Sequence, residues 1–428
     1  MKKMIFFHRH IPLLVLLLTH SPLKWLSAVP LIGLAVLYVN AAKPNRTETI
    51  IILTLTILLI VGAILNLAQD QSATSIILGI YLLLPNLVLP LIFSKAVPYC
   101  DPVKTFKNFT LIQFIFITFE FFWLAATYKT LDIYTVDQSA GDHIAGTFIT
   151  FSTPLAISFS FIALFFLSLF FKTSDKKHLF YTSLSVLIVL ATGAMAVATL
   201  LLPILIVYFS HQTIRSKINV KRKVFFVLVS IVLFISVLIV QQSNIAYTQK
   251  NIELIQEANK PLKIELAVKV AQNALNFGEF FYGTGIGTFS SRASLFLSGH
   301  YLTDQYFIPV SPSELSKILI LPYFNTHTPG VLTNGYDSLS IVSEPFSQFT
   351  TLVSEYGVFG LLIFILGYTW LILISIRKRN ATLFTYYMLS LLFLLINNWL
   401  EYSSFTAVFL LLISIETRST KNIIPIKV

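Results

Sequence analysis

Charged residues are scarce in this 428-residue chain, at 11% of its side chains, and acidic residues (19) are fewer than basic ones (30). Soluble domains usually carry about 25% charged residues. Apolar side chains make up 56% of the chain, so it has too little polar surface to cover a water-soluble globule. The composition therefore excludes an ordinary soluble protein and indicates one for which lipid is part of the solvent.

Cysteine is nearly absent, because Cys100 is the only one in the sequence. A single thiol excludes an intramolecular disulfide and a cysteine-based metal site. The remaining Asp and His residues show no spacing typical of metal ligands. We therefore expect no metal ion and no cofactor.

The chain contains long apolar blocks with few or no charged residues. They have about the length that a helix needs to cross a hydrocarbon core of about 30 Å. This pattern predicts an all-α polytopic membrane protein, a bundle of about twelve transmembrane helices. The blocks lie at 10–20, 26–40, 49–68, 75–96, 109–128, 151–171, 179–192, 194–209, 224–240, 357–376, 382–398 and 402–416.

The basic residues form short clusters beside the apolar blocks, which is typical of topology signals and not of a nucleic-acid surface. Basic clusters flank 179–209 on both sides, so this stretch must cross an even number of times, as a hairpin around Thr192-Gly193. The full assignment places both termini and most of the 30 basic residues on the cytoplasmic side. We expect the multi-pass protein in a bacterial cytoplasmic (inner) membrane.

Three regions follow from this topology. Residues 1–240 hold membrane helices one to nine, with an extracytoplasmic loop at 129–150. Residues 241–356 form a large extracytoplasmic, periplasmic loop domain, and residues 357–428 hold helices ten to twelve and a cytoplasmic tail. Loops as long as 241–356 are usually functional or disordered, and this one is rich in aromatic residues. We expect any chemistry to take place there.

A glycine-rich run in that loop is the most informative stretch of the sequence. Three alternating glycines, Gly283, Gly285 and Gly287, precede Ser290, Ser291 and Arg292. Their backbone amides could approach a phosphate, with Ser290 capping a short helix and Arg292 supplying a forked cation. The alternative is that the glycines only make a tight turn.

The same run, followed by Ser354-Glu355-Tyr356-Gly357 at the opening of a span, resembles the loop-to-helix signature of the O-antigen ligase and polymerase superfamily. The similarity covers about 240–376 and is closer to the Wzy-type polymerases of O-antigen and exopolysaccharide. It implies a helical bundle of the GT-C-like kind and inverting glycosyl transfer on undecaprenyl-diphosphate-linked oligosaccharides at the outer face of the membrane, without nucleotide sugar or metal. The implied partners are membrane lipid, a chain-length regulator and a flippase, but no nucleic acid.

Two alternatives remain open from the sequence. An O-antigen ligase transferring glycan to lipid A-core is the nearest enzyme, but ligases of the superfamily tend to have His and Asn where this chain has Ser347 and Gln348. A flippase or transporter of lipid-linked oligosaccharide should concentrate polar residues in its spans. Here Glu120 is the only charged residue in the middle of a predicted span, which favours an enzyme.

The proposed reaction needs a cation for the departing diphosphate and a base for the attacking hydroxyl. Arg292 is the only arginine in the external portion and is our candidate for the cation. The catalytic candidates are Arg292, Glu355, Glu344 and His300, although Glu355 equally fits a carboxylate at a helix N-terminus. The substrate-binding candidates are Gly283, Gly285, Gly287, Ser290, Ser291, Gln348, Lys317, Glu120 and Glu401.

Overall fold

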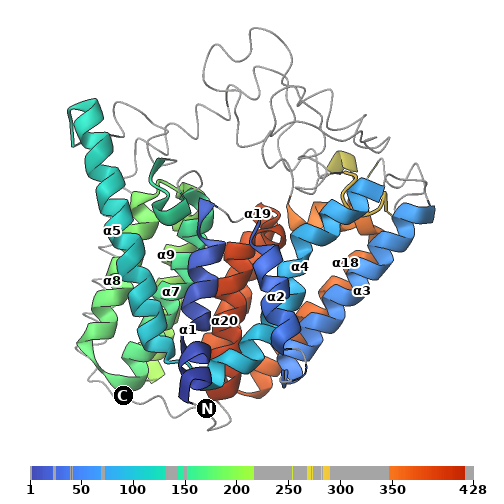
Figure 1. Cartoon of the computed structure of the whole chain (residues 1–428). Helices are drawn as coiled ribbons and strands as arrows, with labels where there is room; N and C mark the ends of the chain where they lie inside the picture. The colour runs from blue at the N-terminus through green and yellow to red at the C-terminus, as the bar shows by residue number, and fades with distance from the viewer. Residues whose placement is uncertain are drawn as a thin grey trace.

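A computed structural model of the chain describes residues 2–22, 26–38, 40, 42–68, 73–131, 133, 143–148, 152–215, 253, 268–270, 272, 281, 283–289 and 347–419. These residues form helices, turns and loops, with no strand among them (Figure 1). The α-helices are α1 (Lys2–Thr19), α2 (Ala28–Tyr38), α3 (Arg46–Ala68), α4 (Ala73–Ala96), α5 (Pro102–Tyr128), α7 (Ser152–Thr173), α8 (Lys176–Ala191), α9 (Met195–Arg215), α18 (Gln348–Arg377), α19 (Ala381–Ile396) and α20 (Ser403–Ser419). The short 3-10 helices are η3 (Val97–Tyr99), η5 (Gly146–Phe148) and η7 (Trp399–Glu401).

Every predicted apolar block except 224–240, which lies outside the described residues, coincides with one of these helices. The predicted hairpin within 179–209 is confirmed, because α8 and α9 are separate helices. Gly193, between them, has a φ of 64°, a left-handed conformation that favours glycine. The prediction of an all-α architecture is therefore confirmed for the described chain.

Six helices of the described chain are long and apolar enough to cross a membrane: α3, α4, α5, α7, α9 and α18. By contrast, α2 has only 11 residues and so rises about 16 Å, at 1.5 Å per residue. That length is about half of a hydrocarbon core, so α2 by itself is too short to cross. Twelve crossings stay a prediction.

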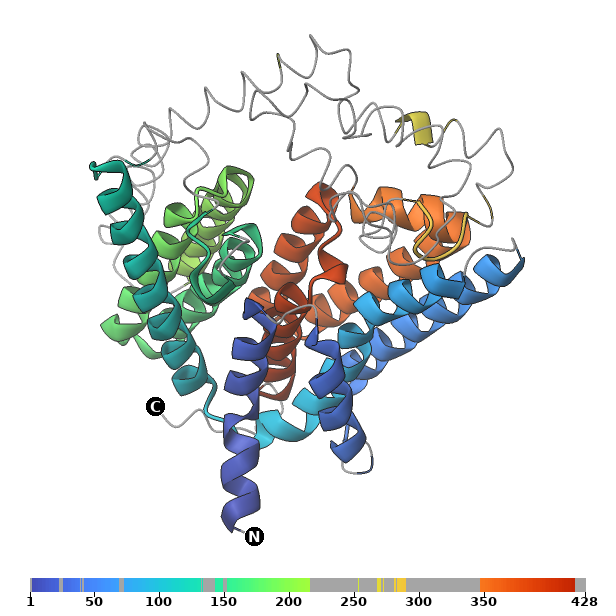
Figure 2. The same cartoon turned by 45° about the horizontal axis from the view of Figure 1, so that its top comes forward.

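The core of the bundle is built around α7 and α20. The apolar stretch of α7 is 89% buried, and α7 packs against α8, α9, α19 and α20. Phe161 of α7 shows how the core is filled, since its ring lies within about 6 Å of the rings of Tyr386, Phe393, Phe405 and Phe409. Figure 2 shows the other helices standing around this pair.

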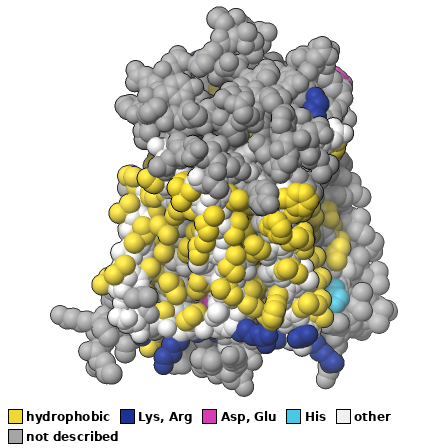
Figure 3. Space-filling model, turned by 90° about the vertical axis from the view of Figure 1, so that its right-hand side faces the viewer, with side chains coloured by type: hydrophobic (Ala, Val, Ile, Leu, Met, Phe, Trp, Pro, Cys, Tyr) yellow, Lys and Arg dark blue, Asp and Glu magenta, His cyan; other side chains and the backbone are white. Residues whose placement is uncertain are grey.

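The two ends of the bundle differ in chemistry. The face made by α3 and α18 carries a band of hydrophobic side chains with Lys and Arg along its lower edge (Figure 3). Such an exposed apolar band is what a lipid-facing surface requires. We call the lower end, where α1 begins and α20 ends, the basic end, and the opposite end the outer end. Both terminal helices thus meet one side, while the identity of the membrane stays a prediction.

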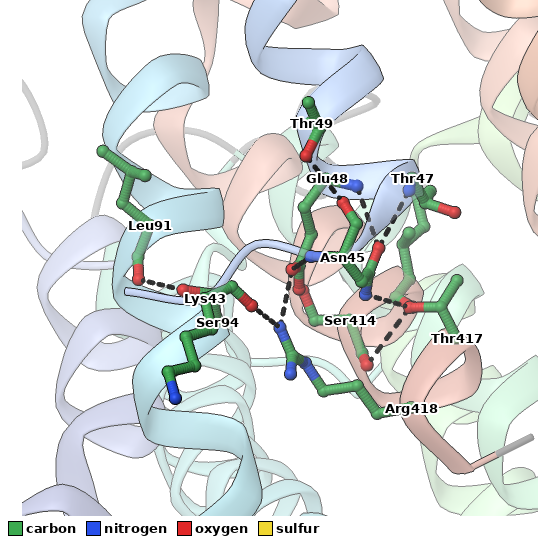
Figure 4. A network of polar contacts seen from close by, with 11 residues as sticks. Lys43, Asn45, Thr47, Glu48, Thr49, Leu91, Ser94, Ser414, Thr417 and Arg418 are labelled. Atoms are coloured by element: carbon green, nitrogen blue, oxygen red, sulfur yellow. Dashed lines mark hydrogen bonds and ion pairs between the residues drawn. The ribbon is translucent and has the colours of Figure 1, made fainter. Parts of the chain in front are cut away.

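A buried ion pair closes the basic end (Figure 4). Arg418 of α20 donates to the carboxylate of Glu48 in α3 at 2.6 Å, and the two side chains are 9% and 2% exposed. The same guanidinium donates to the carbonyl of Lys43, and Ser414 donates to the other oxygen of Glu48 at 2.7 Å. The C-terminal helix is thereby tied to the turn that precedes α3.

The helix that holds the tenth predicted span extends beyond that span. The sequence placed the start of the span at Gly357, which stays a prediction, and α18 begins nine residues earlier, at Gln348. Ser347 caps this start by accepting from the backbone N–H of Thr350 at 3.3 Å. Gly357 instead interrupts α18, since its φ of 64° and ψ of −171° are not helical.

Candidate functional site

The glycine loop, residues Gly283–Phe289, is docked on the interruption in α18. The backbone N–H of Thr284 donates to the carbonyl of Ser354 at 2.7 Å, and that of Gly285 donates to the carbonyl of Glu355 at 2.9 Å. These carbonyls lack their usual intrahelical partners because α18 breaks at Gly357. The loop therefore satisfies polar groups that the break would otherwise leave unpaired inside the bundle.

The side chain of Glu355 holds the second half of the loop. Its two carboxylate oxygens accept from the backbone N–H groups of Gly287 at 2.8 Å and Phe289 at 3.0 Å. Glu355 is fully buried, and a charged acceptor strengthens both hydrogen bonds. The arrangement makes Glu355 a positioning residue that fixes the loop.

Glycine is needed on both sides of this contact. A Cβ on Gly357 would clash with the carbonyl of Phe281, and a Cβ on Gly283 would lie 2.5 Å from the backbone nitrogen of Gly357. Both glycines have positive φ, 72° for Gly283 and 64° for Gly357. The backbones of loop and helix therefore approach more closely than any other residue would allow.

Two further glycines make room for the tip of the loop. Ile286 is 1% exposed, and a Cβ on Gly79 of α4 would lie 2.6 Å from its Cγ1. A Cβ on Gly62 of α3 would lie 3.1 Å from the Cβ of Ile286. Small residues on membrane helices permit this kind of close packing, so α3, α4 and α18 together form the seat of the loop.

We expect Gly357→Ala to lower the free energy of unfolding by about 1–3 kcal/mol, the cost of forcing a side chain into strained backbone. The loop should detach from α18 at the same time. Thermal unfolding of purified protein, with limited proteolysis of the loop, measures both effects. Gly33→Ala in α2 is the control, since nothing lies within 4 Å of its Cβ position. Equal stability of the two variants would contradict the docking.

Next to the glycine loop, η7 is clamped between α18 and α4. Gln348 accepts from the backbone N–H of Leu400 at 3.3 Å, and Asn86 donates to the carbonyl of Leu400 at 2.6 Å. Thr351 donates to the side-chain oxygen of Asn398 at 2.9 Å. Gln348, predicted to contact substrate, is 3% exposed and here supports η7.

Glu401 of η7 lies beside a cleft at the outer end. The side chain is 6% exposed, and the cleft is small, with about 20 Å³ of space, enough for about one water molecule. Tyr81 of α4 and the serines at the start of α20 also line it. Carboxylate, phenol and hydroxyl groups are suited to hydrogen-bonding sugar hydroxyls. Because α18 holds both η7 and the glycine loop, the cleft and the loop lie at the same end of the bundle.

Glu120 holds a different loop. Its carboxylate accepts from the backbone N–H groups of Gly146, at 2.7 Å, and Ala145. Lower in α5, Gln113 pairs with Thr147, accepting from its N–H at 3.0 Å and donating to its hydroxyl at 2.5 Å. The segment 144–148 is thus inserted among the helices, where irregular backbone is tolerated because protein surrounds it. These contacts give Glu120 a structural role, which is to hold the segment 144–148 among the helices.

The described part of the chain brings some predicted site residues together and leaves others out. Gly283, Gly285, Gly287, Glu355, Gln348 and Glu401 gather at the outer end, around the start of α18. Glu120 contacts a separate loop. The remaining candidates lie outside the described residues, and their roles stay predictions: Ser290, Ser291, Arg292, His300, Lys317 and Glu344.

For two of the predicted site residues the structure shows a contact within the chain. The amide of Gly287, one of the amides that could approach a phosphate, donates to the carboxylate of Glu355. The oxygens of Glu355, a candidate base, accept from the loop that it holds, and the side chain is buried. The physical reason is the same in both cases, because a nest of backbone amides binds any anion and the nearest one is within the chain.

Sequence reasoning missed the glycines that seat the loop and the role of Asn86. Gly62 and Gly79 stand alone within long apolar blocks, where an isolated glycine signals close backbone approach. Asn86, also within a block, is the kind of polar residue that joins membrane helices.

No protein-family model matches the chain, and no curated protein matches it. The assignment of a function therefore depends on the residues themselves.

Proposed function

We propose that the protein polymerises undecaprenyl-diphosphate-linked oligosaccharide repeat units by inverting glycosyl transfer at the outer face of a bacterial cytoplasmic membrane. The observation that carries the proposal is the fixed glycine loop at the outer end. The loop ends at Phe289, whose N–H is held by Glu355, and Arg292 follows three residues later. The glycine loop would thus give Arg292 a fixed point of attachment from which to supply a cation at the level of the lipid headgroups.

In this reaction a hydroxyl oxygen of one lipid-linked repeat attacks the anomeric carbon of a lipid-linked chain. The bond between that carbon and the diphosphate oxygen breaks, and undecaprenyl diphosphate leaves with the bonding electrons. The hydroxyl proton passes to a base, for which Glu344 and His300 are the candidates. Glu355 positions the loop, and Glu401 in the cleft contacts sugar hydroxyls. Fixed cations stabilise the charge that develops on the leaving group.

Arg292→Ala is expected to lower polymer formation by about tenfold to a hundredfold, because a charge-assisted hydrogen bond to phosphate contributes about 1.5–3 kcal/mol. The assay is the polysaccharide ladder of a deletion strain that carries the variant, with the protein level followed by immunoblot. Arg377→Ala, an exposed arginine at the basic end, should leave the ladder unchanged. Full-length polymer from an Arg292→Ala protein that inserts normally would remove Arg292 from the site.

The deletion strain itself separates the three classes of function. Loss of a polymerase leaves single repeats on the lipid carrier at the outer face. Loss of a ligase leaves long chains that are not attached to lipid A-core. Loss of a flippase leaves repeats that face the cytoplasm. Only the first outcome supports the proposal, and either of the others would overturn it.

A further inference from the structure

A large groove opens at the basic end, far along the chain from the candidate site. It lies between the end of α9, the end of α18 and the start of α19, and it offers about 950 Å³. Pockets for ordinary small molecules enclose about 300–1,000 Å³. The groove therefore lies at the upper end of this range.

The walls of the groove are apolar and accessible. Val207 of α9 is 68% exposed, and Ile376 of α18 and Phe384 of α19 are 54% and 36% exposed. All three side chains lie on membrane-length or apolar helices. Within a bilayer, surfaces of this kind contact acyl chains.

The groove carries a positive charge. Arg379 and His211 are among the residues that line it, and no acidic residue is among the described ones that do. The backbone of Arg379 belongs to the tight turn between α18 and α19, where its φ is 50° and its N–H donates to the carbonyl of Ile376 at 2.9 Å. The exposed guanidinium of Arg379 is a group well suited to bind phosphate.

The polar groups beneath the groove are engaged with each other. Tyr208 and Thr382 share a hydrogen bond of 2.8 Å. Asn380 donates to Glu416 at 3.2 Å, and Glu416 also pairs with Lys172 at 3.0 Å. Glu416 is thus compensated by Lys172. Among the described residues Arg379 forms no ion pair, so its positive charge is open to an external anion.

We propose that this groove binds an anionic phospholipid. The phosphate lies against Arg379 and His211, and an acyl chain runs along Val207, Ile376 and Phe384. The positive charge of the groove complements the headgroup, and basic pockets between membrane helices are known binding sites for anionic headgroups. The proposal does not depend on the polymerase function, because it concerns the opposite end of the bundle.

Native mass spectrometry of the purified full-length protein tests the proposal, with phosphatidylglycerol and phosphatidylcholine of the same chain length as probes. The wild-type protein should retain phosphatidylglycerol preferentially. Arg379→Gln should reduce this retention by about tenfold or more, as expected for loss of a charge-assisted contact. Lys378→Gln is the matched control, since Lys378 is the adjacent exposed cation and does not line the groove. It should change retention less than about twofold.

Val207→Trp provides a second variant that fills the groove without changing its charge, and it should weaken binding of both lipids. A photo-crosslinking residue at position 207 then identifies the occupant. Crosslinks to phosphatidylglycerol support the proposal. Crosslinks to residues 224–240 or to a second copy of the chain would overturn it, as would equal retention of the two lipids or equal effects of the Arg379 and Lys378 substitutions.

Discussion

Glu355→Ala is expected to lower the free energy of unfolding by about 2–5 kcal/mol and to abolish polymer formation. Without the carboxylate, the N–H groups of Gly287 and Phe289 are left unpaired inside the bundle. Each unsatisfied buried group costs about 1–3 kcal/mol. Because the same hydrogen bonds fix the end of the glycine loop, the residues that follow it should lose their position together with the stability.

Reversible unfolding in mixed micelles measures the stability, and the polysaccharide ladder measures the activity. Glu355→Gln should fall between the wild-type protein and Glu355→Ala, since an amide can accept one of the two hydrogen bonds and must turn its NH₂ toward the other donor. Glu253→Ala, at an exposed glutamate, is the control and should change stability by less than about 0.5 kcal/mol. Wild-type stability of Glu355→Ala would show that the loop does not depend on this carboxylate.

Arg418→Ala is expected to be similarly destabilising, by about 3–5 kcal/mol, because it leaves the carboxylate of Glu48 buried without a cation. Lys172→Ala is the matched comparison, since Lys172 also pairs with a buried glutamate, Glu416 at 4% exposed, but is itself 41% exposed. Glu416 keeps the hydrogen bond from Asn380, and water can take the place of the exposed lysine. Lys172→Ala should therefore be less destabilising than Arg418→Ala in the same unfolding assay.

Replacing both residues of the pair separates two effects: the loss of the Glu48–Arg418 interaction, and the cost of leaving the charge of Glu48 buried without a partner. In Glu48→Met with Arg418→Met, neither charge remains, and the apolar side chains are of roughly similar length. Such exchanges of a buried pair are often neutral or stabilising, so the double variant should be more stable than Arg418→Ala. A double variant that is less stable than Arg418→Ala would mean that the network of Figure 4 contributes more than the compensation of Glu48.

The positions of the helices were predictable because their length and hydrophobicity are local properties of the sequence. The hairpin of α8 and α9 followed from basic residues on both of its flanks. The part of α18 that precedes the tenth predicted span, Gln348–Tyr356, was assigned to the external loop because it contains several polar residues. In sequence such a stretch resembles a loop, although Ser347 caps it as a helix. The short length of α2 was also missed, because hydrophobicity does not reveal where a helix ends.

The candidate site was predictable in part. The glycine spacing correctly indicated close approach of the backbone to an anion, but not which anion. Glu355 is separated from Gly287 by 68 residues of sequence, and backbone amides carry no side-chain identity that could reveal their partner. The insertion of 144–148 was unpredictable for the same reason, since Gln113 and Glu120 bind its peptide groups and only one of its side chains, that of Thr147.

Both inserted segments are thus recognised largely through atoms that every amino acid shares. Evolution can exchange most of their side chains without loosening the attachment, provided that the acid on the helix and the permissive glycine facing it persist. Divergent homologues should then retain little overall sequence identity and be recognisable only by a few widely separated conserved positions. A search keyed to an acid two residues before a glycine in a membrane helix, with alternating glycines upstream, is the way to find them.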